Sequence, residues 1–220
     1  MGYDWDFGAM APYMHLLWKG LGVTFLYTIG TVISGVAIGL IVGLVRTNAS
    51  TPVALPFRAY VEVFRCTPLL VQLVWMYYAL PVLLGVSMSA ATAAFLSLTL
   101  YGGSFYSEIF RGGIKAIDKG QWEAGHAIGM RRGKIFRRII LPQAVKVMIP
   151  AFINQTVMQL KNTSLVSTVA VGDLLYQGSI ITSTIYRPLE VYTLVAALYF
   201  MMLFPLTLVS GYVERRMEIR

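Results

Sequence analysis

The feature of this sequence that most constrains its fold is a series of long apolar runs separated by short basic segments. A helix needs about 20 apolar residues to cross the hydrocarbon core of a bilayer. Runs near that length lie at residues 21–45, 69–84, 88–110, 144–160 and 189–213. They predict an all-α integral membrane protein with about five transmembrane helices, folded as a single domain over residues 1–220.

The low charge content fits a chain that lies mostly in lipid. Charged residues make up 13% of the chain and hydrophobic residues 57%, whereas about a quarter of a soluble domain is charged. The first apolar run is too long for the core of a cleaved signal peptide, and no basic residue precedes Lys19. We therefore expect this run to be a retained span.

The lysines and arginines are unevenly distributed, and this sets the expected orientation. With five spans and the N-terminus outside, all but three of the 18 basic residues face the cytoplasm; the exceptions are Lys19, Lys161 and Arg187. Cytoplasmic loops are the ones enriched in Lys and Arg. We predict an external N-terminus, with the C-terminus and the segment 114–142 in the cytoplasm. The net charge of +8 then reflects topology, and no nucleic-acid partner is expected.

The sequence lacks the motifs of a membrane enzyme. The single cysteine, Cys66, excludes an internal disulfide. The two histidines are distant from each other, and neither a His-Glu-x-x-His metal site nor a Gly-x-x-x-x-Gly-Lys-Ser/Thr phosphate loop is present. We expect no enzymatic activity, metal or cofactor in this chain, so any ATP hydrolysis would belong to another chain.

Small residues mark one face of the first expected span. Thr31, Gly35, Gly39 and Gly43 are each four residues apart, which places them in one stripe of a helix. Such a stripe lets a second helix approach closely. The third span, 88–110, is rich in Ser, Thr, Gly and Tyr, and we expect it to face other protein or a cavity rather than lipid alone.

The segment 114–142 is the longest polar stretch, and its pattern predicts two short helices joined by a hinge. Asp118 can cap the first helix, with Gln121 three residues on as in a capping box. Gly129 suits the left-handed residue that ends that helix. Pro142 is expected to begin the next helix, where its missing N–H costs little. The alternative is a basic amphipathic stretch lying on anionic lipid, which does not explain the cap and the hinge.

The spacing inside this segment resembles the cytoplasmic EAA loop of binding-protein-dependent ABC importers. That loop reads Glu-Ala-Ala, three residues, Gly, nine residues, Ile-x-Leu-Pro. Here the string is Glu123-Ala124-Gly125, Gly129 and Ile139-Ile140-Leu141-Pro142, with Gly125 in place of the second Ala. Three further strings resemble those of the polar amino acid permeases: residues 64–73, 107–114 and 161–166. Cys66 departs from the usual Gly of the first of these.

The resemblance implies a type I ABC importer permease fold in a bacterial cytoplasmic (inner) membrane. It implies a second permease subunit, identical or homologous, two ATP-binding cassette subunits that bind ATP and Mg, and a periplasmic or extracellular substrate-binding protein, besides membrane lipid. The residues expected to dock on the ATPase are Glu123, Ala124, Gly125 and Gly129. ATPase closure would move the docked helices and switch the pathway between inward- and outward-facing states.

A candidate substrate site lies where the fourth span ends. Polar groups inside a membrane domain are costly and usually functional. The expected substrate-binding residues are Gln155, Gln159, Lys161, Asn162, Thr163 and Ser164. The alternative reading is polar contact between helices of two subunits. No acid occurs in this region before Asp173, so an acidic or amide amino acid is favoured over a cationic one.

Two other functions compete with this reading. One is an ABC permease for another small polar solute. The other is an ion-driven secondary transporter, which would predict inverted repeats and buried carboxylates at mid-membrane. The sequence shows neither, and such a transporter would leave the EAA-like loop unexplained.

Overall fold

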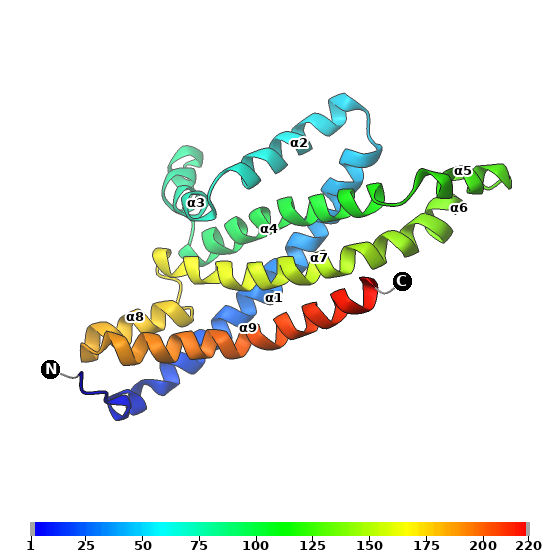
Figure 1. Cartoon of the computed structure of the whole chain (residues 1–220). Coiled ribbons are helices and arrows are strands. Elements are labelled where there is room, and N and C mark those ends of the chain that lie inside the picture. Colours follow the sequence, from blue (N-terminus) through cyan, green and yellow to red (C-terminus); the bar gives the residue numbers. More distant parts are fainter. Residues whose placement is uncertain (1–2, 219–220) are drawn as a thin grey trace.

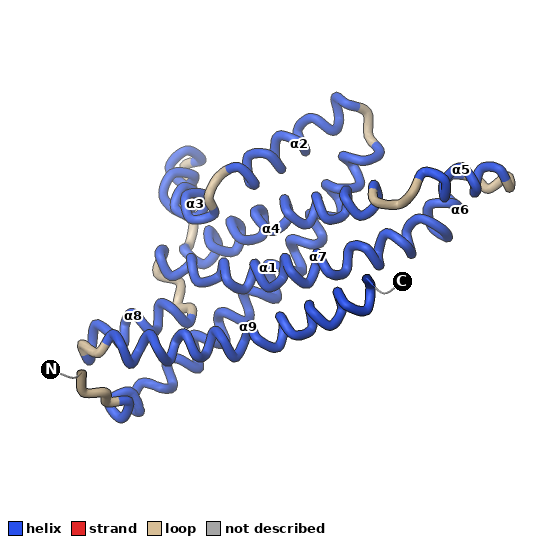
Figure 2. Tube along the Cα trace, in the orientation of Figure 1, coloured by secondary structure: helices blue, strands red, loops and turns tan. Residues whose placement is uncertain are grey.

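The computed structural model describes residues 3–218, and all regular structure in that part of the chain is helical. Short loops join the helices (Figures 1 and 2). In chain order the elements are η1 (Phe7–Tyr13), α1 (Met14–Asn48), α2 (Thr51–Cys66), α3 (Leu69–Leu84), α4 (Ala90–Lys115), α5 (Lys119–Ala127), α6 (Arg132–Ile135), the π-helical turn η2 (Phe136–Ile140), α7 (Leu141–Asn162), η3 (Thr163–Val169), α8 (Leu174–Ile185) and α9 (Pro188–Glu218).

Two helices in the described part, α1 and α9, are each long and apolar enough to cross a bilayer. Two bent pairs could each serve as one broken span: α2 with α3, at 108°, and residues 132–169 with α8, at 46°. The second expected span coincides with α3, which has 16 residues and so extends about 24 Å. That is short for a bilayer core of about 30 Å.

The close helix approach expected for the small-residue stripe is confirmed. A Cβ added to Gly39 would lie 2.5 Å from the Cβ of Tyr106 and 2.9 Å from the backbone nitrogen of Ser107, and one on Gly43 would lie 2.9 Å from the Cβ of Phe110. The backbones of α1 and α4 therefore touch along this stripe. α4 also packs on α2, α3 and α7, and this explains its Ser, Thr and Gly content: it is the inner helix of the bundle.

Pro142 lies in the first turn of α7, as predicted, but no loop separates α7 from the helical turns before it. The helix already starts at Arg132 and runs through η2 into α7, which is visible as one continuous rod in Figure 1. Proline inside a helix lacks an N–H and crowds the carbonyl four residues earlier, here that of Arg138. The π-helical turn just before it widens the helix, and the N–H of Leu141 bonds the carbonyl of Phe136, five residues back. The wider turn accommodates the proline without ending the helix.

At the opposite end of the bundle, the N-terminal segment is fastened to the start of α9. The fully buried carboxylate of Glu190 accepts hydrogen bonds from the Tyr3 hydroxyl at 2.6 Å, the Asp6 backbone N–H at 3.0 Å and Arg187 at 3.0 Å. Arg187 also donates to the carbonyl of Asp4. The hydrogen bond to the Glu190 carboxylate raises the pKa of Tyr3. These bonds fix the entry into α1.

Candidate functional site

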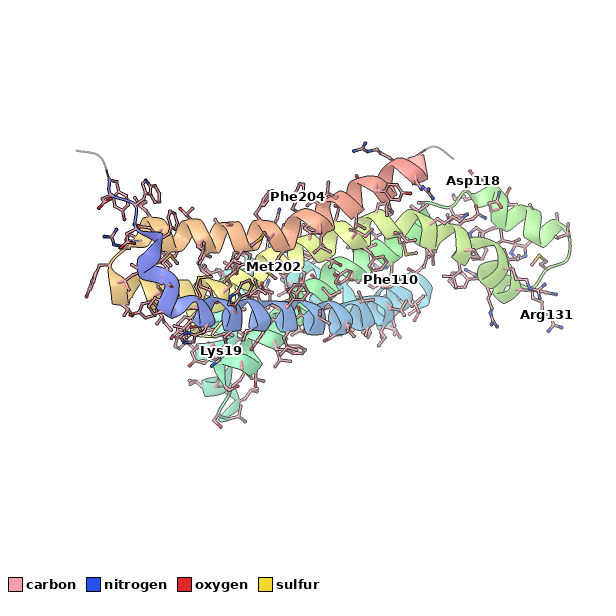
Figure 3. All side chains as sticks on the ribbon, turned by 90° about the horizontal axis from the view of Figure 1, so that it is seen from below. Lys19, Phe110, Asp118, Arg131, Met202 and Phe204 are labelled. Carbon is pink, nitrogen blue, oxygen red and sulfur yellow. The ribbon has the colours of Figure 1, made fainter. Side chains whose placement is uncertain are left out.

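The α5–α6 hairpin, residues 118–135, projects from one end of the bundle (Figures 1 and 3). Asp118 is its N-cap, as predicted: Oδ1 accepts a hydrogen bond from the N–H of Gly120 at 2.6 Å. The reciprocal capping box is not formed in the described structure. The side-chain oxygen of Gln121 instead accepts from the amide of Gln143 at 3.4 Å, a long contact toward the start of α7.

The turn between α5 and α6 is built by backbone bonds around Gly129. Its φ of +75° confirms the predicted left-handed residue. The N–H of Gly129 bonds the carbonyl of His126 at 2.9 Å, and the N–H of Met130 bonds the carbonyl of Gly125 at 3.0 Å. This pair of bonds is the Schellman motif. The turn therefore depends on a backbone conformation that side chains with a Cβ adopt reluctantly.

Close packing at Gly125 and two contacts of the Trp122 ring hold α5 against the segment 132–136. Gly125 is buried, and a Cβ added there would lie 2.8 Å from Cγ1 of the buried Ile135. The rings of Trp122 and Phe136 stack with centroids 6.4 Å apart, and the Arg132 guanidinium lies 6.0 Å from the Trp122 ring. Gly125, which replaces the usual Ala of the EAA loop, is therefore the residue of α5 on which Ile135 of α6 packs directly.

The hairpin presents the rest of its EAA-like residues to its surroundings. Glu123, Ala124 and Gly129 are exposed. In the described structure Glu123 has no ion-pair partner within the chain. Three of the four predicted docking residues are thus available to another protein. The fourth, Gly125, is buried and lets Ile135 pack closely beneath them.

The polar end of α7 divides into residues that hold helices together and residues that do not. Gln159 is fully buried. Its amide nitrogen donates to the Thr31 hydroxyl at 3.1 Å and to the Leu98 carbonyl at 2.9 Å, which joins α7 to α1 and α4. One turn earlier, the Gln155 side chain is half-buried. Gln159 therefore joins helices of the same chain, and these hydrogen bonds do not involve a second subunit.

The residues that follow are differently placed. Lys161 is exposed and has no hydrogen-bond or ion-pair partner in the described structure. The Asn162 side-chain nitrogen is buried without a partner. Thr163 is buried and Ser164 half-buried, and each hydroxyl donates to a carbonyl three residues back. Within the described residues, the predicted set thus keeps four groups without a partner: the Gln155 amide, the Gln159 oxygen, the Lys161 ammonium and the Asn162 nitrogen.

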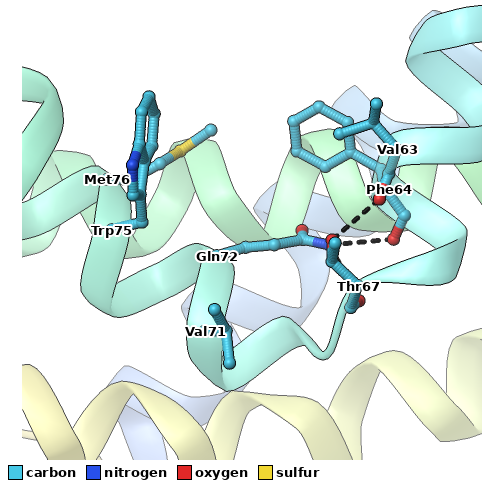
Figure 4. A pocket seen from close by; sticks show the side chains of 7 residues that line it. All are labelled: Val63, Phe64, Thr67, Val71, Gln72, Trp75 and Met76. Carbon is cyan, nitrogen blue, oxygen red and sulfur yellow. Dashed lines mark hydrogen bonds between the residues drawn. The ribbon is translucent and has the colours of Figure 1, made fainter.

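Sequence reasoning missed a cavity of about 340 Å³ in the elbow between α2 and α3 (Figure 4). The amide nitrogen of Gln72 holds the elbow: it donates to the carbonyls of Phe64 and Thr67, at 2.9 and 3.0 Å, and to the Thr67 hydroxyl at 2.6 Å. The Gln72 side-chain oxygen is buried and unpartnered. The cavity is lined by Val63, Phe64, Thr67, Val71, Gln72, Trp75 and Met76. The only sequence signal was the turn residue Pro68 between two apolar stretches.

Comparison with known proteins identifies the family. Residues 35–219 match the family model described as the binding-protein-dependent transport system inner membrane component. The chain belongs to this family. Among curated relatives, a glutamine transport system permease protein of Escherichia coli is 35% identical over 220 residues, 100% of both chains. An arginine transport system permease protein of Bacillus subtilis is 33% identical over 213 residues, 97% of both chains.

Solved structures of ABC transporters share the permease fold. One, the crystal structure of an amino acid ABC transporter with histidines, has a TM-score of 0.91 and 36% identity, and covers 97% of this chain and 100% of that chain. An inward-facing methionine ABC transporter has a TM-score of 0.77 and 25% identity over 94% of this chain and 98% of that one. The chain is an all-α membrane permease subunit of an ABC importer for amino acids, with the type I permease fold.

One ion cluster joins two of the strings that mark the permease. Glu108, near the end of α4, pairs with Arg46 at the end of α1 and with Arg111 one turn on at 2.5 Å. Arg65, on the last turn of α2, reaches the same carboxylate at 3.9 Å and lies 5.4 Å from the Phe105 ring. Glu108 and Arg111 are three residues apart on one helix, a spacing that allows such a pair. The two additional arginines come from helices distant in sequence and were not foreseen.

Proposed function

We propose that this permease carries an amino acid with an amide or acidic side chain. The observation that carries this proposal is that two consecutive residues at the end of α7, Lys161 and Asn162, have an ammonium and an amide nitrogen without a partner in the described structure. An ammonium can bind a carboxylate and an amide can bind a carboxamide. The stretch from residue 124 to residue 172 contains no acid that would neutralise a cationic cargo. One relative that matches over its full length is named for glutamine, and one that matches over 97% of its length is named for arginine.

The α5–α6 hairpin is proposed as the contact with a separate ATPase. Its exposed Glu123 and Ala124, its rigid Schellman turn and its projection from the bundle support this role. On this proposal ATP and Mg are bound by two ATP-binding cassette subunits. A second permease subunit completes the pathway, and an external binding protein delivers the substrate. This chain supplies docking and the pathway, and the hydrolysis belongs to its partners.

The proposed orientation in a bacterial inner membrane places the N-terminus outside and the hairpin in the cytoplasm. It rests on the distribution of Lys and Arg. In a Cys66→Ser background, the variant Asp4→Cys should react with an impermeant thiol reagent on intact cells, and Lys134→Cys should react only after the cells are opened. The reverse labelling pattern would refute the orientation.

The substrate proposal is tested in vesicles containing the assembled importer and its binding protein. We expect glutamine or glutamate to be imported and to stimulate ATP hydrolysis more than arginine or lysine. Lys161→Ala should weaken import of an acidic amino acid more than that of a neutral one. Lys146→Ala, an exposed lysine on the same helix, is the control and should change neither. Preference for a cationic amino acid, or a silent Lys161→Ala, would contradict the proposal.

A further inference from the structure

The Arg65 side chain lies between α4, the helix that leads to the hairpin, and the α2–α3 elbow. α4 ends at Lys115 and α5 begins at Lys119, so a movement of the hairpin passes directly into the last turns of α4. Glu108 sits two turns before the end of α4. Arg65, on α2, contacts this carboxylate and the Phe105 ring on the same helix. It thus connects the helix that leads to the hairpin with the helix that leads to the elbow.

The other side of Arg65 is the elbow itself. Its chain neighbours Phe64 and Thr67 line the elbow cavity and accept the three hydrogen bonds of Gln72. α2 ends at Cys66, one residue after Arg65. A displacement of the Arg65 guanidinium along α4 would therefore act at the last turn of α2, where the chain bends by 108° into α3.

The three arginines around Glu108 are not equivalent. Arg46 and Arg111 hold the carboxylate by hydrogen bonds, and the Arg46 side chain is only 8% exposed. Arg65 meets it at 3.9 Å with a side chain 38% exposed. Pairs this long and this exposed contribute little to stability, and they break and form easily. Arg46 and Arg111 fix Glu108 in place, and Arg65 is the contact that can change between states.

We propose that Arg65 is a positioning residue that transmits the movement of the α5–α6 hairpin to the α2–α3 elbow. The proposal rests on the proposed docking of the hairpin on an ATPase. It assigns Arg65 a role in energy coupling rather than in substrate contact. A rival route exists in the direct packing of Leu69 and Leu73 of α3 against Ala94 and Leu98 of α4, and that route would bypass Arg65.

The test compares Arg65→Gln, Arg65→Lys and the control Arg58→Gln in the complete importer in vesicles. Arg58 is exposed on the same helix and makes no ion pair in the described structure. Residues along a coupling route alter coupling by a factor of about two to thirty. We expect Arg65→Gln to raise the ATP hydrolysed per substrate imported by a factor in this range. Basal ATP hydrolysis and the thermal unfolding midpoint should stay as in Arg58→Gln, and Arg65→Lys should restore part of the loss.

The outcomes separate this inference from the function it rests on. If the unaltered importer does not couple ATP hydrolysis to import, the proposed function fails. If it does, and Arg65→Gln matches Arg58→Gln in import and in coupling, the transmission role of Arg65 is refuted and the direct α3–α4 route is favoured. A fall in the unfolding midpoint with an unchanged ATP-to-substrate ratio would also refute it, because it would show that Arg65 only stabilises the fold.

Discussion

The α5–α6 hairpin and the end of α7 are both polar, but they use their polar groups differently. In the hairpin, backbone N–H and carbonyl groups make the bonds that hold the shape, and Glu123 and Ala124 are left at the surface. At the end of α7, the Gln159 side chain itself binds neighbouring helices. Burying an amide without a hydrogen-bond partner is costly, and the Gln159 nitrogen avoids that cost by bonding two helices. A polar residue type therefore does not by itself distinguish recognition from cohesion.

The largest effect is expected at Gly129, where a substitution tests whether the backbone turn of the hairpin is needed for coupling. A β-branched residue at a φ of +75° is strained by about 1–3 kcal/mol, so Gly129→Val should displace the Schellman turn. A penalty of about 1.4 kcal/mol corresponds to ten-fold, and we expect substrate-stimulated ATP hydrolysis to fall by about that factor or more while the complex still assembles. Gly133→Val is the control, because Gly133 is exposed, has open space around it and has no positive φ. Normal transport by Gly129→Val would show that the turn is not needed.

The second prediction sharpens the contrast within α7. Gln159→Met keeps the side-chain length but removes the bonds to Thr31 and Leu98. The expected loss is about 1–3 kcal/mol of unfolding free energy, measured as a lower thermal unfolding midpoint. Gln155→Met, at a half-buried position one turn earlier, should cost less. Lost transport with an unchanged midpoint in Gln159→Met would instead make Gln159 a substrate residue.

Sequence patterns predicted the parts of the fold that depend on local periodicity or backbone conformation. The stripe from Thr31 to Gly43 was recognisable because helical spacing alone decides which residues share a face. Gly129 was recognisable because few residues tolerate a positive φ. These features need no knowledge of distant segments.

Features that depend on the meeting of distant segments were missed. Arg46, Arg65 and Glu108 come from three helices, and no spacing rule shows that they converge. The π-helical turn before Pro142 was missed, because a proline after a loop and a proline after a π-helical turn look the same in sequence. Gln159 looked like a ligand residue because its partners, Thr31 and the Leu98 carbonyl, lie 128 and 61 residues away.

The smallest effect is expected at Gly125, the buried hairpin residue that packs against Ile135. Alanine there would favour the helix by up to about 1 kcal/mol. Its Cβ would also lie 2.8 Å from Cγ1 of Ile135, an atom held in place by the restricted χ1 rotation of a β-branched side chain. The two effects oppose each other, so Gly125→Ala should change substrate-stimulated ATP hydrolysis far less than Gly129→Val.

A double-variant cycle isolates the packing effect from the helix-propensity effect. Ile135→Ala removes the atoms that the new Cβ would meet, so Gly125→Ala should be better tolerated in that background than alone. The expected interaction energy is about 0.5–1 kcal/mol, within the range for residues in contact, and it can be read from unfolding midpoints with ATP hydrolysis as a second readout. Strict additivity would mean that the two arms of the hairpin do not press on each other at this point. The hairpin surface offered by Glu123 and Ala124 would then be shaped by α5 alone.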